Sequence, residues 1–213
     1  MNNLEKPSDT AIGKSQFIEF LLQQKALRFG DFTLKSGLKS PFFINLGQVN
    51  SGAAYAFLGQ ALAQTLKAAF PQTTVLYGPP YKGISMAAVT AVAFYRQYGG
   101  ELFTFYSRKE AKRHGEGGMF IGHVPQKDDR IVIVDDVLTT GGTKLEAIRL
   151  LEATFGVRVE GVLVTVDRRT KSQMQESLGL PFATVLSLTD IIEYLHERND
   201  ARYELLRNFY EGV

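Results

Sequence analysis

The stretch IVIVDDVLTTGGTKLEAI, residues 131–148, decides the fold. Its first four residues, 131–134, are all β-branched and apolar, a pattern typical of a strand that is buried on both faces. Two carboxylates, Asp135 and Asp136, follow at once. A Thr-Thr-Gly-Gly-Thr run, 139–143, then leads into helical residues. The stretch therefore predicts a strand, a polar turn and a helix, with the acidic pair at the solvent-facing end of the strand.

The rest of the chain repeats this alternation. Helices are predicted at 52–69, 83–97, 142–154 and 188–197, and strands at 73–77, 102–106, 131–134, 157–166 and 181–186. Strands that alternate with helices predict an α/β fold with a mostly parallel central sheet and helices on both faces. Ligands of such sheets bind beyond the carboxyl ends of the strands.

The N-terminal part differs in character. Residues 1–13 are expected to be a flexible tail, and a helical period with Ser15 as its cap follows. Two short β-type runs, 29–34 and 41–46, predict a hairpin outside the main sheet. We expect residues 14–213 to form one domain, with a small hood at about 14–50 that includes the hairpin.

Composition excludes several classes of protein. Hydrophobic residues make up 45% and charged residues 22% of the 213 residues, as in ordinary globular chains rather than disordered ones. There is no cysteine, so neither disulfides nor a thiolate metal site can form. A net charge of +2 is too small to indicate nucleic acid as a partner. No apolar run predicts a signal peptide or a membrane span, and we expect a cytoplasmic protein with no membrane partner.

The polar turn of residues 131–148 has the chemistry of a phosphate site. Glycines let backbone N–H groups approach an anion, and the following helix adds unpaired donors and the positive end of its dipole. Asp135 and Asp136 can accept hydrogen bonds from sugar hydroxyls or face a divalent cation. Together they suit ribose 5-phosphate. The alternative, that the acidic pair only caps a turn, accounts for less of the pattern.

Residues 131–143 resemble the phosphoribosyl pyrophosphate signature of the type I phosphoribosyltransferases. The resemblance implies that this segment binds phosphoribosyl pyrophosphate through a continuous set of residues: Asp135, Asp136, Val137, Leu138, Thr139, Thr140, Gly141, Gly142 and Thr143. The signature does not identify the base that accepts the ribose.

A glycine-rich basic segment, YSRKEAKRHGEGG at 106–118, narrows the choice of base. Such a loop can close over a pyrophosphate group and neutralise it. The segment resembles the flexible catalytic loop of orotate phosphoribosyltransferases. That resemblance implies phosphoribosyl pyrophosphate contacts from Arg108, Lys109, Lys112 and His114. It also implies a homodimer, because the lysine at the Lys112 position reaches the neighbouring subunit's site in that family.

The hairpin FTLKSGLKSPFFIN resembles the hood of the same family. The resemblance implies that Lys35 contacts both substrates and that Phe43 and Ile44 contact orotate, although the family commonly has a second aromatic residue where Ile44 stands. Since neighbours on a strand face opposite ways, one of Phe42 and Phe43 is expected in the core.

Two further turns after predicted strands complete the resemblance. GPPYKG, 78–83, is similar to the family's pyrophosphate-binding turn, which places Tyr81 and Lys82 on the diphosphate. VTVDRRTKS, 164–172, ends a strand with an arginine pair. By resemblance Arg168 holds the orotate carboxylate, and Thr139 also contacts orotate.

The resemblance implies transfer of the 5-phosphoribosyl group from phosphoribosyl pyrophosphate to orotate in pyrimidine (UMP) biosynthesis. The implied catalytic residues are Lys112, Lys82, Asp135, Asp136 and His114. Mg²⁺ is the expected cofactor, held mainly by the substrate close to Asp135 and Asp136, and no direct protein ligand set is predicted.

Two alternatives stay open. A purine phosphoribosyltransferase is favoured by the Thr-Gly-Gly-Thr form of the turn, where orotate enzymes of the nearest pattern read Thr-Ala-Gly-Thr. A regulator that senses phosphoribosyl pyrophosphate would need a nucleic-acid module, for which the chain has no spare domain. His123 and His196 are given no role.

Overall fold

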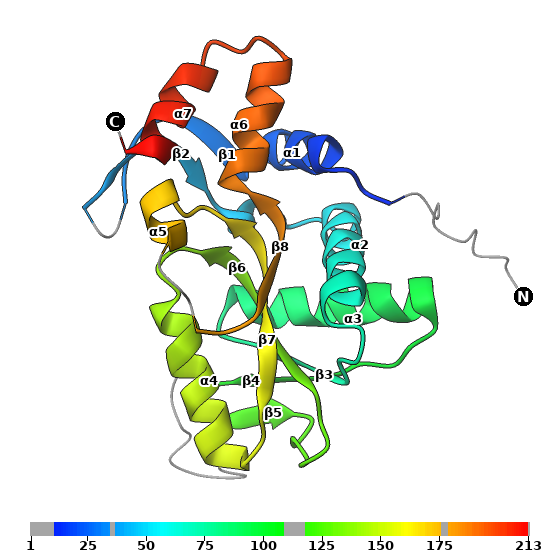
Figure 1. The fold of residues 1–213 in the computed structure, drawn as a ribbon. Coiled ribbons are helices and arrows are strands. Elements are labelled where there is room, and N and C mark those ends of the chain that lie inside the picture. Colours follow the sequence, from blue (N-terminus) through cyan, green and yellow to red (C-terminus); the bar gives the residue numbers. More distant parts are fainter. Residues whose placement is uncertain (1–10, 35–36, 109–117, 176–178, 213) are drawn as a thin grey trace, which may run out of the picture.

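The computed structural model describes residues 11–34, 37–108, 118–175 and 179–212. Its main sheet has six strands in the order β5-β4-β3-β6-β7-β8 (Figure 1). The pairs are parallel except for β5, which is antiparallel to β4. The strands are β3 Val75–Gly78, β4 Phe103–Ser107, β5 Phe120–Gly122, β6 Ile131–Leu138, β7 Val159–Asp167 and β8 Phe182–Ser187. The predicted α/β fold with a mostly parallel sheet is confirmed.

Helices cover both faces of this sheet. α2, Gly52–Ala69, and α3, Lys82–Tyr98, lie on one face, and α4, Gly142–Phe155, lies on the other (Figure 1). The central strand β6 serves both cores: Val132 and Val134 join the larger buried cluster, whereas Ile131 and Ile133 join the smaller one. All four side chains are fully buried, as the uninterrupted apolar run predicts.

Strand β6 is longer than the sequence predicts, because it runs through the acidic pair to Leu138. Its pairing with β3 stops at Ile133, while its pairing with β7 continues to Leu138 opposite Asp167. The second half of β6 therefore has a strand neighbour on one side only. This half-open edge is what allows Asp135 and Asp136 to lie inside a strand.

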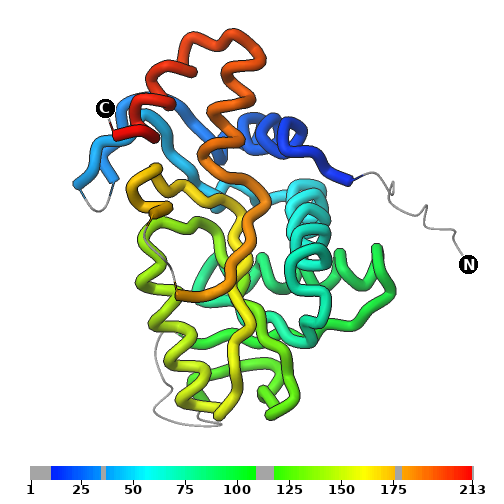
Figure 2. The backbone as a smooth tube through the Cα atoms, in the orientation of Figure 1, coloured from blue at the N-terminus to red at the C-terminus, as the bar shows by residue number. Residues whose placement is uncertain are grey.

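The hood is built from both ends of the chain (Figure 2). It contains α1 Lys14–Gln23, the antiparallel hairpin β1 Leu27–Thr33 and β2 Lys39–Ile44, a 3-10 helix Leu46–Gln48, α6 Leu188–Glu197 and α7 Tyr203–Glu211. A short helix α5, Lys171–Gln175, follows β7. The sequence predicts α1, the hairpin and α6, but neither β5 nor α7.

The predicted cap of α1 is wrong. The helix begins at Lys14 with Gly13 as N-cap, and no side chain caps it. The predicted N-terminal tail falls mostly on residues 1–10, which lie outside the described residues. Among the described helices, none has the length and apolar character needed to cross a bilayer.

Candidate active site

Two lysines hold the acidic pair of β6. Lys144 Nζ lies 2.6 Å from Asp135 Oδ2, and Lys82 Nζ lies 2.7 Å from Asp136 Oδ2. The backbone also contributes, since Asp135 Oδ1 accepts from the N–H of Asp136 and Asp136 Oδ1 from that of Val137, each at 2.8 Å. Both carboxylates keep some contact with solvent, with 17% and 21% of their side chains exposed. They are therefore fixed in orientation and still accessible to a ligand.

Burial raises the pKa of the Asp135 carboxyl, and the neighbouring charge of Asp136 adds to the rise, while Lys144 opposes it. Burial likewise raises the pKa of the Tyr77 hydroxyl, which shares a 2.8 Å hydrogen bond with Ser107. The interior behind the acidic pair is thus poorly solvated, so electrostatic interactions there are stronger than at the protein surface.

Lys144 is a site residue that the sequence analysis missed. It lies in the first turn of α4, is 9% exposed, and also donates to the carbonyl oxygen of Val137 at 3.0 Å. A lysine three positions into a helix reads as an ordinary exposed residue. The signal that could have identified it is the sharp turn before α4, which folds the helix start back toward the strand's own carboxylates.

The Thr-Thr-Gly-Gly-Thr run forms the turn from β6 into α4. Gly141 is the N-cap of α4 with φ of 78°, a left-handed conformation that favours glycine. Within the described residues, no protein acceptor receives a hydrogen bond from the backbone N–H groups of 139–143. These donors surround the positive end of the α4 dipole, so the segment is equipped to bind an anion.

The side chains of this segment divide into two groups. Those of Thr139, Thr140 and Thr143 are exposed, whereas that of Leu138 is 2% exposed and belongs to the core. Val137 is partly buried against the core. Any ligand contact from Val137 or Leu138 would therefore come from the backbone.

The GPPYKG turn after β3 packs tightly against β6. A Cβ on Gly78 would lie 2.3 Å from the carbonyl oxygen of Gly83, and one on Gly83 would lie 2.8 Å from the carbonyl oxygen of Val134. The Pro80–Tyr81 peptide is cis. Lys82 is the first residue of α3, and Tyr81 is 70% exposed. Both glycines are needed for the close approach that places Lys82 beside Asp136.

These segments enclose one cleft of about 560 Å³. It is lined by Pro79, Pro80, Tyr81, Lys82, Ile133, Asp135, Asp136, Thr143, Lys144 and Ala147. The cleft joins the turn after β3, the acidic pair of β6 and the start of α4, which the sequence predicts to act together.

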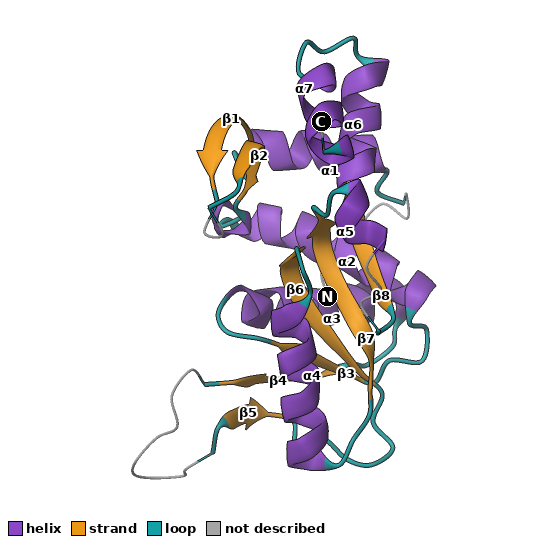
Figure 3. Cartoon of the chain, turned by 60° about the vertical axis from the view of Figure 1, so that its left-hand side comes forward, coloured by secondary structure: helices purple, strands orange, loops and turns teal. Residues whose placement is uncertain are grey.

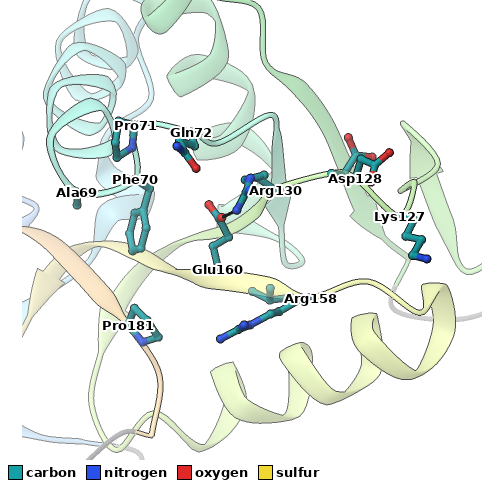
Figure 4. A pocket seen from close by; sticks show the side chains of 12 residues that line it. Ala69, Phe70, Pro71, Gln72, Lys127, Asp128, Arg130, Arg158, Glu160 and Pro181 are labelled. Atoms are coloured by element: carbon teal, nitrogen blue, oxygen red, sulfur yellow. Dashed lines mark hydrogen bonds and ion pairs between the residues drawn. The ribbon is translucent and has the colours of Figure 1, made fainter.

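A larger cavity, about 790 Å³, lies at the amino ends of the strands, and Figure 4 shows its lining side chains. Phe70 and Pro181 lie on one side of it, and Arg130 is paired with Glu160 at 2.7 Å. Most of its lining residues precede strands or, like Glu160, lie at the start of one. Because ligands of parallel sheets bind at the carboxyl ends, the smaller cleft is the better candidate for the functional site.

The arginine pair after β7 separates into two roles. Arg169 forms a buried ion pair with Asp167, its Nη2 lying 2.7 Å from Oδ2. Arg168 is 9% exposed and has no carboxylate partner within the described residues. Its Nη2 donates to Ser40 Oγ at 3.1 Å, and burial lowers the pKa of its guanidinium. Arg168 therefore retains a buried positive charge that an anionic ligand can satisfy.

The hood hairpin stands over the carboxyl ends of β6 and β7 (Figure 3). The Ser40–Arg168 hydrogen bond ties β2 to the end of β7, and the N–H of Arg168 donates to the carbonyl oxygen of Leu138 at 3.1 Å. Arg168 thus lies directly beside the start of the candidate anion-binding segment, 139–143.

Within the hairpin, side chains alternate as expected. Phe42 is fully buried and Ile44 is 7% exposed, so both belong to the core. Phe43 points the other way, is partly exposed and stacks on Phe32 with ring centroids 5.4 Å apart. The side chain of Ile44, expected to contact orotate, is therefore buried in the core, whereas the ring of Phe43, for which the same contact is expected, is accessible. Lys35 lies outside the described residues.

The basic segment is described only at its ends. Arg108 is partly buried, and its Nη1 atom is buried without a hydrogen-bond partner among the described residues. Lys109, Lys112 and His114 lie outside the described residues. The histidines without a predicted role lie elsewhere: His123 bonds to Asp129 at 2.7 Å, and His196 is exposed beside Tyr203.

The carboxylates present fit a metal ion that is shared with a substrate better than one held by protein alone. Within the described residues, no cluster of three or more histidine, cysteine or acidic side chains could hold a metal. Asp135 and Asp136 offer oxygen ligands, but each already faces a lysine. Mg²⁺ commonly uses one or two carboxylates together with substrate phosphates.

Comparison with known proteins gives one consistent result. The phosphoribosyl transferase domain family matches residues 47–178. The orotate phosphoribosyltransferase of Nitrosococcus oceani is 39% identical to this chain, and the match covers 90% of this chain and 90% of that protein. The orotate phosphoribosyltransferase of Methylococcus capsulatus is 42% identical, and the match covers 85% of this chain and 88% of that protein. The crystal structure of the Francisella tularensis orotate phosphoribosyltransferase is 30% identical, with a TM-score of 0.78, and covers 92% of this chain and 97% of that one. Leishmania donovani UMP synthase is 28% identical with a TM-score of 0.75, over 94% of this chain and 43% of its own.

Proposed function

Because this chain belongs to the orotate phosphoribosyltransferase family, we propose that it transfers the 5-phosphoribosyl group from phosphoribosyl pyrophosphate to orotate. The products are orotidine 5′-monophosphate and pyrophosphate, a step in pyrimidine biosynthesis. The observation that carries the proposal is the cleft in which the acidic pair of β6, Lys82 and the start of α4 meet. Directly after the neighbouring strand β7 lies Arg168, which has no carboxylate partner among the described residues.

Phosphoribosyl pyrophosphate has three parts for which the site offers matching groups. The N–H groups of 139–143, which have no protein acceptor among the described residues, suit the 5-phosphate. Asp135 and Asp136 suit the ribose hydroxyls, since ionised carboxylates only accept hydrogen bonds. Lys82 and the GPPYKG turn suit the diphosphate on the same cleft.

The reaction breaks the bond between the anomeric carbon and the diphosphate oxygen, and a ring nitrogen of orotate forms the new bond. Positive charge develops on the sugar in such transfers. The two carboxylates beneath the sugar stabilise that charge. Lys82, Arg108, Lys109, Lys112 and His114 are proposed to stabilise the negative charge on the departing pyrophosphate. A Mg²⁺ ion bound with the diphosphate beside Asp135 and Asp136 would neutralise part of it.

Arg168 is the proposed ligand of the orotate carboxylate. A guanidinium binds a carboxylate through two parallel hydrogen bonds, and Arg169 is already engaged in this way with Asp167, its Nε donating to Oδ1 and its Nη2 to Oδ2. Lys35, Phe43, Ile44 and Thr139 are proposed to complete the base site; of the described three, the Phe43 ring and the Thr139 side chain are accessible.

The Thr-Gly-Gly-Thr form of the turn does not conflict with orotate. When the orotate pattern Thr-Ala-Gly-Thr is counted from Thr139, its glycine falls on Gly141, the residue with the positive φ. At Gly142, where that pattern has threonine, a Cβ would meet no atom within 4 Å. The departure changes the phosphate cradle rather than the base site.

The proposal extends to the assembly. By family resemblance the chain acts as a homodimer in the cytoplasm, and Lys112 of each subunit serves the other subunit's site. The exposed Tyr81–Lys82 turn leaves the cleft open to such a contribution.

The test is an absorbance assay of orotate loss with phosphoribosyl pyrophosphate and Mg²⁺. We expect turnover of orotate and none of adenine or hypoxanthine. Turnover of a purine in place of orotate would refute the assignment. Binding of phosphoribosyl pyrophosphate without turnover of any base would instead support a sensor.

A further inference from the structure

Arg168 owes its position to two groups of the hood strand β2. Its Nη2 donates to Ser40 Oγ at 3.1 Å, and its guanidinium carbon lies 4.8 Å from the centre of the Phe42 ring. Ser40 is 3% exposed and Phe42 is fully buried. Because neither support carries a negative charge, they orient the guanidinium without neutralising it.

Phe42 is fixed in turn by Phe209 of the C-terminal helix α7. The two ring centroids are 5.7 Å apart and the ring planes meet at 84°. Aromatic rings attract each other in this edge-to-face arrangement. Phe209 and the fully buried Leu206 pack against the core, so α7 is seated on the hood by a small apolar face.

Helix α7 is also attached to α5, which begins three residues after Arg168. Lys171 forms an ion pair with Glu211, and the Tyr210 hydroxyl lies 3.6 Å from the sulfur of Met174. Helix α7 therefore contacts both strand β2, whose side chains support Arg168, and helix α5, which follows Arg168 in the chain.

A cavity of about 590 Å³ flanks the contact between Phe42 and Phe209. Its lining includes Ser40 and Pro41 of β2 together with Leu205, Asn208 and Phe209 of α7. Open space next to Phe209 means that no neighbour stands ready to replace its ring. Loss of that ring would leave Phe42, and with it the guanidinium, free to move.

We propose that Phe209 is a positioning residue for the acceptor base, which holds Arg168 in place through Phe42. The inference rests on the proposed function, because it takes Arg168 to be the ligand of the orotate carboxylate. It assigns to the C-terminal helix, which the sequence analysis did not predict, a part in base recognition.

The test compares steady-state kinetics of the wild type with those of Phe209→Ala. We expect KM for orotate to rise about five- to tenfold, because one aromatic contact is lost. KM for phosphoribosyl pyrophosphate and kcat stay at their wild-type values. Phe209→Tyr, which keeps the ring, restores KM for orotate. An unchanged KM for orotate, or equal rises in both KM values, would overturn the inference.

Two further variants separate positioning from stability. Phe209→Leu keeps apolar volume but lacks the ring, so KM for orotate rises while the melting temperature stays close to that of the wild type. Leu205→Ala truncates a side chain that is 55% exposed on the same helix, and it leaves both KM values unchanged. A Leu205→Ala effect equal to that of Phe209→Ala would mean that α7 acts only through helix stability.

A double variant tests the route through Arg168. If Phe209 acts on orotate through that guanidinium, Phe209→Ala adds nothing to the KM change already caused by Arg168→Lys. Additive changes would show that Phe209 acts independently. The wild-type assay with orotate separates the two levels of proposal. Without wild-type turnover both fail, whereas turnover with an unaffected Phe209→Ala variant refutes only the positioning role.

Discussion

Lys144 compensates a carboxylate that burial would otherwise force toward its neutral form. The pKa of Asp135 is raised above its ordinary 3.8 by burial, and Lys144 opposes that rise. A carboxyl whose pKa is higher in the folded than in the unfolded protein contributes its full stability at pH values below its pKa in the unfolded chain. That contribution to the free energy of unfolding is lost as the pH rises through the pKa of the folded state. Removing Lys144 raises the folded pKa further, so the resulting loss of stability must grow with pH.

We expect Lys144→Met to lower the free energy of unfolding by on the order of 2 kcal/mol at neutral pH and by much less near pH 4, because the buried carboxylate loses its partner. Urea denaturation at both pH values measures this difference. Lys171→Met is the matched control, since it breaks an ion pair on the surface and should change stability at neither pH. Equal losses at the two pH values for Lys144→Met would assign its effect to packing rather than to charge.

The arginine pair after β7 predicts opposite outcomes for two identical substitutions. Arg168→Lys removes the two-pronged donor proposed for orotate, so KM for orotate should rise roughly ten- to hundredfold with little change in melting temperature. Arg169→Lys disrupts the buried pair with Asp167 and should lower the melting temperature. Kinetics and thermal unfolding of both variants measure this contrast. A larger orotate effect from Arg169→Lys would reverse the assignment.

At the scale of elements, the start of α4 predicts a substitution that harms neither the fold nor the binding of the phosphate. A Cβ on Gly142 meets no protein atom within 4 Å, and an alanine at a helix start is compatible with helical geometry. Gly142→Ala should therefore leave stability unchanged or raise it by about 0.5 kcal/mol. The orotate pattern has threonine at this position, so a side chain there is compatible with a phosphate against these amides, and KM for phosphoribosyl pyrophosphate should stay at its wild-type value. Thermal unfolding measures the stability and steady-state kinetics the KM; a raised KM would mean that the phosphate site of this chain, unlike that pattern, requires glycine at position 142.

The turn between β3 and α3 predicts the reverse behaviour. A Cβ on Gly83 would lie 2.5 Å from Pro79 Cδ and 2.8 Å from the carbonyl oxygen of Val134, so Gly83→Ala must push the turn away from β6. We expect a loss of about 1–3 kcal/mol in stability, together with weaker binding of phosphoribosyl pyrophosphate as Lys82 is displaced. Gly52→Ala is the control, because it is the same change in the first turn of α2 with no atom nearby. Wild-type stability of Gly83→Ala in urea denaturation would contradict the close packing described for this turn.

At this scale the sequence predicts those elements whose structure is determined by neighbouring residues, and it misses features that depend on contacts between separate segments. Buried strands and amphipathic helices follow from residue pattern, and the strand, turn and helix of residues 131–154 were predicted in the right order. The extension of β6 to Leu138 was not, because it depends on β7 pairing beyond the point where β3 stops. The cap at Ser15 failed because polar residues at 14–16 offered no means of choosing among neighbouring start points. Lys144 was missed because its partner comes from the tertiary fold.

At the scale of the whole molecule, the division into hood and sheet was only half visible in sequence. The hairpin follows from its turn residues, but the hood also contains α6 and α7, nearly the full chain length away (Figure 2). Contacts such as Phe42 with Phe209 join residues whose pairing no local pattern records. The proposed base site therefore draws on the end of β7, the hairpin and, through the hairpin, the C-terminal helix, whereas the proposed phosphate site is nearly complete within residues 131–144.

The proposed sharing of the basic segment between subunits makes a prediction for the whole assembly. Lys112→Ala should lower kcat about a hundredfold, because one donor to the departing pyrophosphate is lost. Arg168→Ala should be inactive at ordinary orotate concentrations for a separate reason. We suppose that each active site combines Arg168 of one subunit with Lys112 of the other. Mixing the two variants under conditions of subunit exchange then gives hybrid dimers with one intact site. Random exchange then restores roughly a quarter of wild-type activity. Sedimentation at the assay concentration checks that dimers are present. No recovery in dimers that demonstrably exchange would mean that each site uses its own chain's lysine.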